Sequence, residues 1–397
     1  MKKVYLDNNA TTKVDEVVVE IMKPYFSEMY GNPNSLHKFG SETHKGMSKA
    51  INQTYSAINA SDEDDIVFTS CATESNNWVI KSVWLDLIRN GERDHIITTE
   101  VEHPSVLSTF KFLESEGVKV TYLPVNSEGY VSAETVKSFV TGNTALVSVM
   151  MANNETGVIF PIKEIADICK ANGTLFHTDA VQAVGKIPVD VQDLGVDFLS
   201  MSAHKFHGPN GVGALYIKAG KTISPMFHGG SQMGGLRSGT LNVPLIIGMG
   251  QAIENAVNNI PTLNSETRRL RDKIEDALLS QLKDTFVVGD KDNRTPNTIL
   301  ISVRGVEGEG MLWDLDKKFG ISAATGSACA SEDLEANPVL EAIGAEEDLA
   351  HTAIRLTLSR YTSEEDADYT IEKFIESANR LRAISSSYAT VQAQNII

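Results

Sequence analysis

Short apolar runs alternate with stretches of helical periodicity between about residues 65 and 220. The first helical stretch, which begins near 73–75, is the clearest, because Val79, Val83 and Leu87 repeat every four residues beside a second apolar row. Strands and helices that alternate in this way are typical of a mostly parallel sheet wrapped by helices. The pattern predicts seven strands, at 66–68, 95–97, 119–122, 145–148, 174–176, 198–200 and 213–217.

The alternation ends at a glycine-rich stretch, 228–240, and a different arrangement follows. A charged helical pattern extends over about 265–282, two apolar strands follow at 298–303 and 353–358, and a helix is predicted through 366–382. These elements suggest a smaller α+β domain in the last third of the chain.

The length of 397 residues and an apolar fraction of 42% allow a large core, divided among two or three domains. We place a domain boundary near residue 260. The sequence therefore predicts a large domain over 15–260, a small domain formed by 1–14 together with 261–385, and a flexible polar tail at 386–397.

The charge balance limits the possible partners. The chain has 35 basic and 52 acidic residues, a net charge of −17, which opposes non-specific binding to nucleic acid and to anionic membrane surfaces. The first residues contain no apolar signal segment, and no later run approaches the ~18 apolar residues of a membrane span. We therefore expect a cytoplasmic protein that binds small molecules or other proteins, with no nucleic acid or membrane partner.

Asp179 and Lys205 each stand at the end of a predicted strand. The carboxyl ends of parallel strands meet at one edge of the sheet, where open α/β sheets bind ligands, so this carboxylate and this amine should face one pocket. Pyridoxal phosphate uses such a pair: an amine that binds its aldehyde and, in many enzymes, an acid that keeps its pyridine nitrogen protonated. A structural Lys–Asp salt bridge is the alternative, and position alone slightly favours it.

Other residues at the same edge favour the cofactor. A phosphate is held by backbone N–H groups, hydroxyls and a helix N-terminus. Thr73 begins the helix after the first strand, Ser202 and His204 stand beside the lysine, and 228–240 offers glycines, hydroxyls and an arginine. Glycine-rich turns are more often simple turns, so this loop adds little alone. Together these residues make the salt bridge the weaker explanation.

The histidines admit two interpretations each. His103 follows the second predicted strand, where it could stack on a cofactor ring or move protons near neutral pH, but a hydrogen-bonded loop histidine explains its local sequence equally well. His204 and His207 are three residues apart and invite a metal interpretation. Pro209 just beyond argues against a rigid helical ligand pair, and no carboxylate is adjacent, so no metal is expected.

Cys71, Cys169 and Cys329 have spacings that fit neither a disulfide framework nor a zinc site. Cys169 shares one helical face with two isoleucines and is predicted to be core, and Cys71 is predicted to pack beside the phosphate site. Cys329 lies among small residues that leave it free to move into a pocket and back, although a buried structural cysteine is the commoner case. Arg355 alternates with apolar residues in a strand, and it could clamp a carboxylate if it faces a pocket, although most such arginines are solvated.

Six short motifs follow one another between about residues 4 and 380. They are YLDNNATT at 5–12, GNPNSLH at 31–37, NNETG at 153–157, HTDAVQ at 177–182, SAHK at 202–205 and RSGT at 237–240. Together they resemble the cysteine desulfurases, which are class V pyridoxal-phosphate enzymes of fold type I, and they occur in the order of that family. The resemblance implies an α/β fold, with a mostly parallel mixed sheet in the large domain and a smaller α+β domain.

The resemblance also implies roles for the residues around the cofactor. It makes Lys205 the Schiff-base lysine, Asp179 the partner of the pyridine nitrogen and Gln182 a donor to the phenolic oxygen of the ring. His103 becomes the stacking residue and a candidate for proton transfer. Four further residues would hold the phosphate, the last of them from the other subunit of a homodimer: Thr73, Ser202, His204 and Thr240.

The resemblance further implies a substrate and a reaction. Asn154 and Arg355 match residues that bind the substrate, L-cysteine, with Arg355 on its carboxylate. Cys329 matches the nucleophile that takes the sulfur as a persulfide while L-alanine is released. The segment 326–329 resembles the long-loop branch of the family, which serves iron–sulfur cluster assembly, so an iron–sulfur scaffold or a sulfur-carrier protein is the expected acceptor.

Other functions stay open on the residues alone. A selenocysteine lyase or a small-amino-acid aminotransferase of the same class would share Lys205 and Asp179 without needing Cys329. A non-catalytic scaffold could keep the fold, although the complete set of site residues argues against it. An oxidoreductase with a dinucleotide-binding fold would need a G-x-G-x-x-G turn after the first strand, and 69–73 contains no glycine. The end of the chain, 385–397, shows no identifiable docking motif, so the docking mode of an acceptor stays open.

Overall fold

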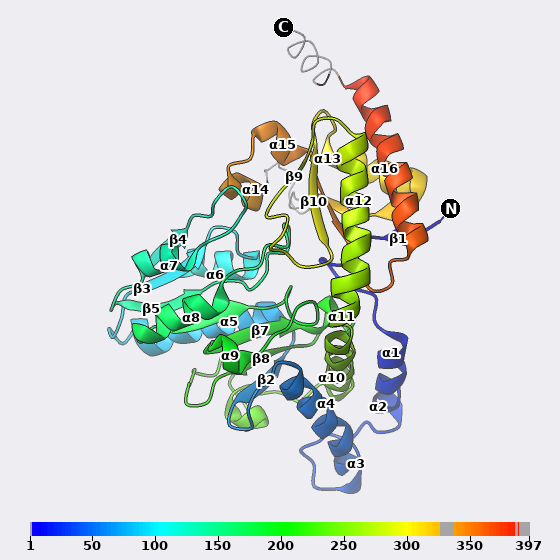
Figure 1. Ribbon diagram of the computed structural model, residues 1–397. Coiled ribbons are helices and arrows are strands. Elements are labelled where there is room, and N and C mark those ends of the chain that lie inside the picture. The colour runs from blue at the N-terminus through cyan, green and yellow to red at the C-terminus, as the bar shows by residue number, and fades with distance from the viewer. Residues whose placement is uncertain (1, 326–336, 386–387, 389–397) are drawn as a thin grey trace.

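The computed structural model describes residues 2–325, 337–385 and 388 (Figure 1). The largest sheet has seven strands in the order β2-β8-β7-β6-β5-β3-β4, and each corresponds to one of the predicted apolar runs. Strand β8 is antiparallel to both of its neighbours and the other pairs are parallel, so the sheet is mixed but mostly parallel. The strands are β2 (Asp65–Thr69), β3 (His95–Thr99), β4 (Lys119–Leu123), β5 (Thr144–Ser148), β6 (Leu175–Asp179), β7 (Phe198–Ser202) and β8 (Gly213–Ile217).

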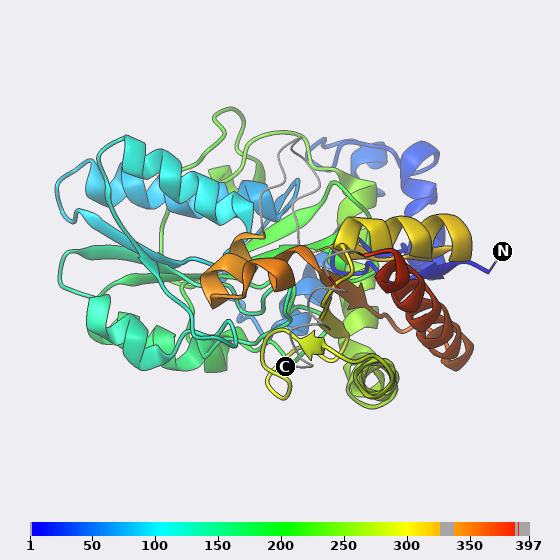
Figure 2. The ribbon, with the colours of Figure 1, turned by 90° about the horizontal axis from the view of Figure 1, so that it is seen from above.

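Helices cover both faces of this sheet. In β7, Phe198 joins the hydrophobic cluster of α5 and α6 on one face, and the next residue, Leu199, joins the cluster of α4, α8 and α10 on the other. Both faces are therefore buried, which is why the strands appear as continuous apolar runs. Figure 2 shows α5 and α6 in blue and cyan and α7 and α8 in green on opposite sides of the strands. The helices are α4 (His44–Ala57), α5 (Ala72–Val83), α6 (Pro104–Ser115), α7 (Ala133–Phe139), α8 (Ile162–Ala171), α9 (Val191–Leu194) and α10 (Val243–Asn258).

Helix α10 packs along α4, and the sequence pattern does not predict it. Apolar residues continue around most of α10 and glycines interrupt them, so it lacks the clear periodicity of a surface helix. Gly250 allows the close approach of the two helices, because a Cβ atom there would lie 2.5 Å from the Cα atom of Ala50. The N-terminal segment adds three short helices: α1 (Glu16–Met22), α2 (Pro24–Ser27) and α3 (Lys38–Ser41).

A second group of elements follows α10 along the chain. A four-stranded antiparallel sheet has the order β12-β13-β10-β9, and β1 pairs in parallel with β11. Helices α12 and α16 bury Ile274 and Phe374 in a cluster of their own. The main elements are β1 (Val4–Tyr5), α11 (Ile260–Thr262), α12 (Arg268–Gln281), β9 (Thr285–Val287), β10 (Thr298–Val303), α13 (Gly308–Asp314), β11 (Ile321–Ser322), β12 (Ala324–Thr325), α14 (Pro338–Ile343), α15 (Glu347–His351), β13 (Ala353–Thr357) and α16 (Glu364–Ile384).

The two groups of elements have separate hydrophobic clusters. Strand β1 belongs with the second group, since Val4 pairs with Ile321, and the predicted boundary near 260 falls at the short helix α11. The domain boundaries themselves stay a prediction. In the described ranges, no helix is both long and apolar enough to cross a membrane.

Candidate active site

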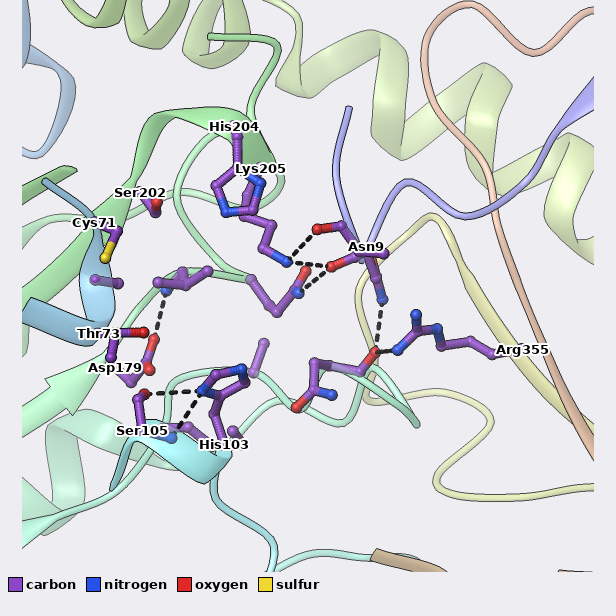
Figure 3. A pocket seen from close by; sticks show the side chains of 17 residues that line it. Asn9, Cys71, Thr73, His103, Ser105, Asp179, Ser202, His204, Lys205 and Arg355 are labelled. Atoms are coloured by element: carbon purple, nitrogen blue, oxygen red, sulfur yellow. Dashed lines mark hydrogen bonds between the residues drawn. The ribbon is translucent and has the colours of Figure 1, made fainter. Parts of the chain in front are cut away.

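A cavity of about 320 Å³ lies at the carboxyl edge of the large sheet. Asp179 is the last residue of β6 and Ser202 the last of β7, and the chain continues from Ser202 into a 3-10 turn that ends at Lys205. The cavity thus lies where an open α/β sheet binds its ligand. Nine of the eleven predicted site residues line it (Figure 3): Thr73, His103, Asn154, Asp179, Gln182, Ser202, His204, Lys205 and Arg355.

Lys205 has no carboxylate partner among the residues that the structure describes. Its Nζ donates hydrogen bonds to the carbonyl oxygens of Asn9 at 2.6 Å and Ala10 at 2.7 Å. Asp179 instead accepts from the Asn76 side chain, so the alternative of a structural Lys–Asp salt bridge is wrong. Burial, together with the positive charge of Arg355, lowers the pKa of Lys205 to about 8. This amine can therefore lose its proton near neutral pH.

Asp179 is a buried and hydrogen-bonded carboxylate. Its Oδ2 accepts from Nδ2 of Asn76 at 2.7 Å and its Oδ1 from the backbone N–H of Val181 at 3.0 Å. Glu102 also lies buried in this region, and burial together with the negative charge of Asp179 raises its pKa to about 8. Glu102 is therefore protonated at neutral pH and adds no second negative charge beside Asp179.

His103 caps helix α6 and also lines the cavity. Its Nδ1 accepts from the backbone N–H of Ser105 at 3.1 Å and lies 2.8 Å from the Ser105 hydroxyl oxygen. An Nδ1 that accepts a hydrogen bond leaves the proton of the neutral ring on Nε2. Burial lowers the pKa of His103, which favours this neutral form. The hydrogen-bonded loop interpretation is therefore correct for Nδ1, and a role of the ring toward a cofactor stays a prediction.

Three residues form a polar wall at the start of α5 and the end of β7. Thr73 lies in the first turn of α5, whose N-terminus has no side-chain cap. The Ser202 hydroxyl is buried and has no hydrogen-bond partner in the described part of the chain. Nδ1 of His204 lies 3.2 Å from the Thr11 hydroxyl oxygen. Burial and the positive charge of Lys205 lower the pKa of His204 to about 4. An uncapped helix N-terminus and an unpaired hydroxyl can both bind an anion.

Arg355 is buried rather than solvated, and it faces the cavity. Its Nη2 pairs with Asp7 at 2.9 Å, and its Nη1 pairs with Glu155 at 2.7 Å and donates to the carbonyl oxygen of Asn154 at 3.1 Å. The buried Nε has no partner in the described ranges. Arg355 is therefore held in place on two sides and keeps N–H groups for another carboxylate.

The other two predicted site residues are not among the described residues that line the cavity. Thr240 is exposed and lies outside it, and Cys329 lies outside the described residues. Of the other cysteines, Cys71 lines the cavity as N-cap of α5. Cys169 is a core residue as predicted, 1% exposed, and burial raises the pKa of its thiol to about 12.

Comparison with known proteins identifies the family. The aminotransferase class-V family matches residues 4–370. The chain belongs to this family. It is 48% identical over 385 residues to a cysteine desulfurase of Nostoc sp., covering 97% of this chain and 95% of the relative, and 47% identical over 373 residues to a cysteine desulfurase IscS of Clostridium botulinum, covering 94% and 93%. A solved NifS-like protein has a TM-score of 0.88 at 41% identity, covering 94% of this chain and 99% of that one.

The class-V aminotransferases use pyridoxal phosphate, and the cavity of this family member fits that cofactor. Ser202 and the uncapped N-terminus of α5 can hold a phosphate. Asp179 can hold a protonated ring nitrogen, and Lys205 offers an amine with a lowered pKa to the aldehyde. The predicted fold class and cofactor are thereby confirmed.

The lowered pKa of Lys205 predicts how cofactor capture by this class-V protein depends on pH. An amine attacks an aldehyde only when it is unprotonated, so the capture rate of cofactor-free protein should rise roughly tenfold per pH unit below pH 8 and level off above it. An ordinary lysine would extend the rise to about pH 10.5. Stopped-flow absorbance after mixing with pyridoxal phosphate measures the rate. A tenfold rise that persists well above pH 8 would contradict the prediction.

The sequence patterns miss several residues of this site. Asp7, Asn9, Asn76, Glu155 and Lys186 each bond a predicted residue. Two of them, Asp7 and Asn9, stand in the first motif and Glu155 stands in the third, so the motifs were the available signal. No signal marks Asn76 or Lys186.

Proposed function

We propose that this chain is a cysteine desulfurase that converts L-cysteine to L-alanine and passes the sulfur, as a persulfide on Cys329, to an acceptor protein. Relatives that are 46–48% identical over nearly the whole chain are named cysteine desulfurases. The structural observation that supports the proposal is one cavity lined by Lys205, Asp179 and Arg355. Lys205 is an amine that pairs with no carboxylate of the described ranges, Asp179 is a buried carboxylate and Arg355 is a buried arginine.

The residues around the cofactor have distinct tasks in this proposal. Bound pyridoxal phosphate supplies an electron sink for bonds at the substrate α-carbon. Nζ of Lys205 holds the cofactor and then removes the α-proton, for which its lowered pKa suits it. The Asp179 carboxylate keeps a proton on the ring nitrogen, and the Gln182 amide donates to the phenolic oxygen. His103 stacks on the ring, and its imidazole, once it has taken up a proton, returns that proton to the product.

Phosphate binding involves both the helix N-terminus and a second subunit in this proposal. Thr73, Ser202 and His204 hold the phosphate from one chain. Thr240 is exposed in the single chain, and we assign it to the site of a second copy, so the active enzyme is a homodimer. These assignments come from the motifs. For Ser202, a buried hydroxyl that has no hydrogen-bond partner among the described residues supports the assignment.

The substrate carboxylate binds Arg355 and Asn154, and Cys329 takes the sulfur. The Cys329 thiolate attacks the sulfur of L-cysteine, so an S–S bond forms and the Cβ–S bond breaks. The electron pair of that bond stays with Cβ, which gains a proton to give L-alanine. Thr325, four residues before Cys329, ends strand β12, which pairs with β13 beside Arg355. The position of this strand supports a cysteine that acts near the substrate.

The acceptor and compartment complete the proposal. IscS is part of the name of some relatives, and the 326–329 motif resembles the branch that serves iron–sulfur assembly. We therefore propose an iron–sulfur scaffold or a sulfur carrier as acceptor, in the cytoplasm.

One experiment tests the reaction directly. Purified protein loaded with pyridoxal phosphate is given L-cysteine without a keto acid, alanine is quantified, and the chain is analysed by mass spectrometry without reductant. We expect alanine and one added sulfur on Cys329, whereas Cys329→Ser should keep the cofactor and form no persulfide. Alanine formation only after a keto acid is added would indicate an aminotransferase. Undiminished sulfide release by Cys329→Ser would contradict the role of this cysteine.

A further inference from the structure

Lys186 is a buried lysine beside the cavity that the reaction above does not use. It is 6% exposed and forms no ion pair with any described residue. Its Nζ donates instead to two neutral amide oxygens, Oδ1 of Asn9 at 2.8 Å and Oε1 of Gln182. Lys186 lies in the turn that follows β6, four residues after Gln182.

The titration of a buried lysine in this place opposes folding. Burial, with the positive charges of Lys205 and Arg355, lowers the pKa of Lys186 well below its ordinary value. The unfolded chain binds a proton here that the folded chain releases, so this group lowers the free energy of unfolding increasingly as the pH falls from about 10.5 toward the lowered pKa. An apolar side chain would avoid this loss. What the lysine offers at this position is therefore its two hydrogen bonds.

Two contacts, one from Lys186 and one to the Asn9 carbonyl oxygen, set which way the Gln182 amide faces. A lysine Nζ that donates to Oε1 turns the oxygen toward itself and the NH₂ group away. Nε2 of Gln182 then donates one hydrogen to the carbonyl oxygen of Asn9 at 2.9 Å, and its second hydrogen is available to a ligand in the cavity that Gln182 lines. The same Asn9 carbonyl accepts from Nζ of Lys205 at 2.6 Å. These four residues form one hydrogen-bonded unit, part of which is visible in Figure 3.

We infer that Lys186 is a positioning residue, which fixes the Gln182 amide so that an N–H group, rather than the C=O group, faces the phenolic oxygen of pyridoxal phosphate. The inference rests on the proposed function for the role of Gln182. Without Lys186, Oε1 of Gln182 loses its donor and Asn9 loses a side-chain contact, so only the Asn9 carbonyl still favours this orientation. An amide that turns over presents a carbonyl oxygen, which the phenolate oxygen repels. Gln182 would then be present but would no longer donate.

A double-mutant cycle tests this inference through cofactor binding rather than turnover. Wild type, Lys186→Met, Gln182→Met and the double variant are freed of cofactor, and each is titrated with pyridoxal phosphate to obtain a dissociation constant. The absorbance of the bound cofactor is then followed against pH. A hydrogen bond to a charged acceptor is lost in each single variant, so each should bind roughly tenfold more weakly, with a shifted pH titration. The double variant should be weaker than Gln182→Met by less than about twofold.

The controls separate positioning from folding. Lys163→Met removes an exposed lysine and should leave both readouts unchanged. If Lys186→Met does not fold, Lys186→Gln replaces it, because the shorter side chain also loses the bond to Gln182. Equal weakening by the Lys186 variant in both backgrounds, or none in the wild-type background, would overturn the inference. A wild type that binds no pyridoxal phosphate would overturn both proposals, whereas one that gives the expected cycle but no alanine would overturn only the desulfurase.

Discussion

Replacing Lys205 with alanine should remove covalent cofactor binding and slow alanine formation by about 10³- to 10⁴-fold. The variant loses both the amine that binds the aldehyde and the base that takes the α-proton. Its pyridoxal phosphate should wash out on gel filtration, and borohydride should fix the cofactor to the wild-type chain but not to the variant, as mass spectrometry of the intact protein will show. Alanine release from L-cysteine measures the loss of turnover.

The local structure suggests that this variant will fold. The carbonyl oxygen of Asn9, one of the two acceptors of Lys205, keeps its hydrogen bond from Gln182 at 2.9 Å. Removing a buried amine with a lowered pKa favours folding, whereas losing its two hydrogen bonds opposes folding. Because these two effects oppose each other, the free energy of unfolding should change little. Lys163→Ala is the matched control, because Lys163 is an exposed lysine that pairs with Asp193 and does not line the cavity. A Lys205→Ala protein that retains covalent cofactor would show that another amine binds it.

The edge of the sheet was predictable because strand ends can be located from apolar runs. Strands β6 and β7 are buried along almost their whole length, and each begins with two apolar residues that mark it in the sequence. Asp179, at the end of β6, and Lys205, just after β7, could therefore be placed at one edge. Helix α10 could not be predicted, because its apolar residues surround most of it and Gly250 interrupts the pattern. Periodicity identifies amphipathic helices, and short apolar runs between turns identify buried strands. Helix α10 shows neither of these two patterns.

The supporting residues of the site were less predictable, because tertiary contacts bring them together. Asn9 reaches Lys186 across 177 positions of sequence, and Asn76 reaches Asp179 across 103. Neither pattern nor charge shows such a contact. The alternation around Arg355 showed that it leaves the apolar face of its strand, but it could not show that the other face is also buried. The motifs, rather than the periodicity, indicated that this arginine belongs to a site.

Arg355→Met should raise the KM for L-cysteine by roughly 10²-fold and destabilise the fold by about 3–5 kcal/mol. The substrate carboxylate loses a charge-assisted hydrogen-bonding partner, which explains the KM. The stability loss has a second cause, because Asp7 and Glu155, at 2.9 and 2.7 Å from the guanidinium, lose their cation. Steady-state kinetics with L-cysteine measures the first effect, and urea unfolding of the cofactor-free protein measures the second.

The pH dependence and a second substitution separate the two effects of Arg355→Met. Burial raises the pKa of Glu155, and the charge of Arg355 counteracts this, so removing the arginine should raise the pKa further. An acid whose folded pKa exceeds its unfolded pKa binds more protons in the folded state, so the variant should regain stability as the pH falls through the folded pKa of Glu155. Adding Glu155→Gln removes the unpaired charge, and it should restore much of the stability while the KM stays high. An unchanged KM in Arg355→Met would exclude this arginine from substrate binding, and a KM restored together with stability would show that its role is structural.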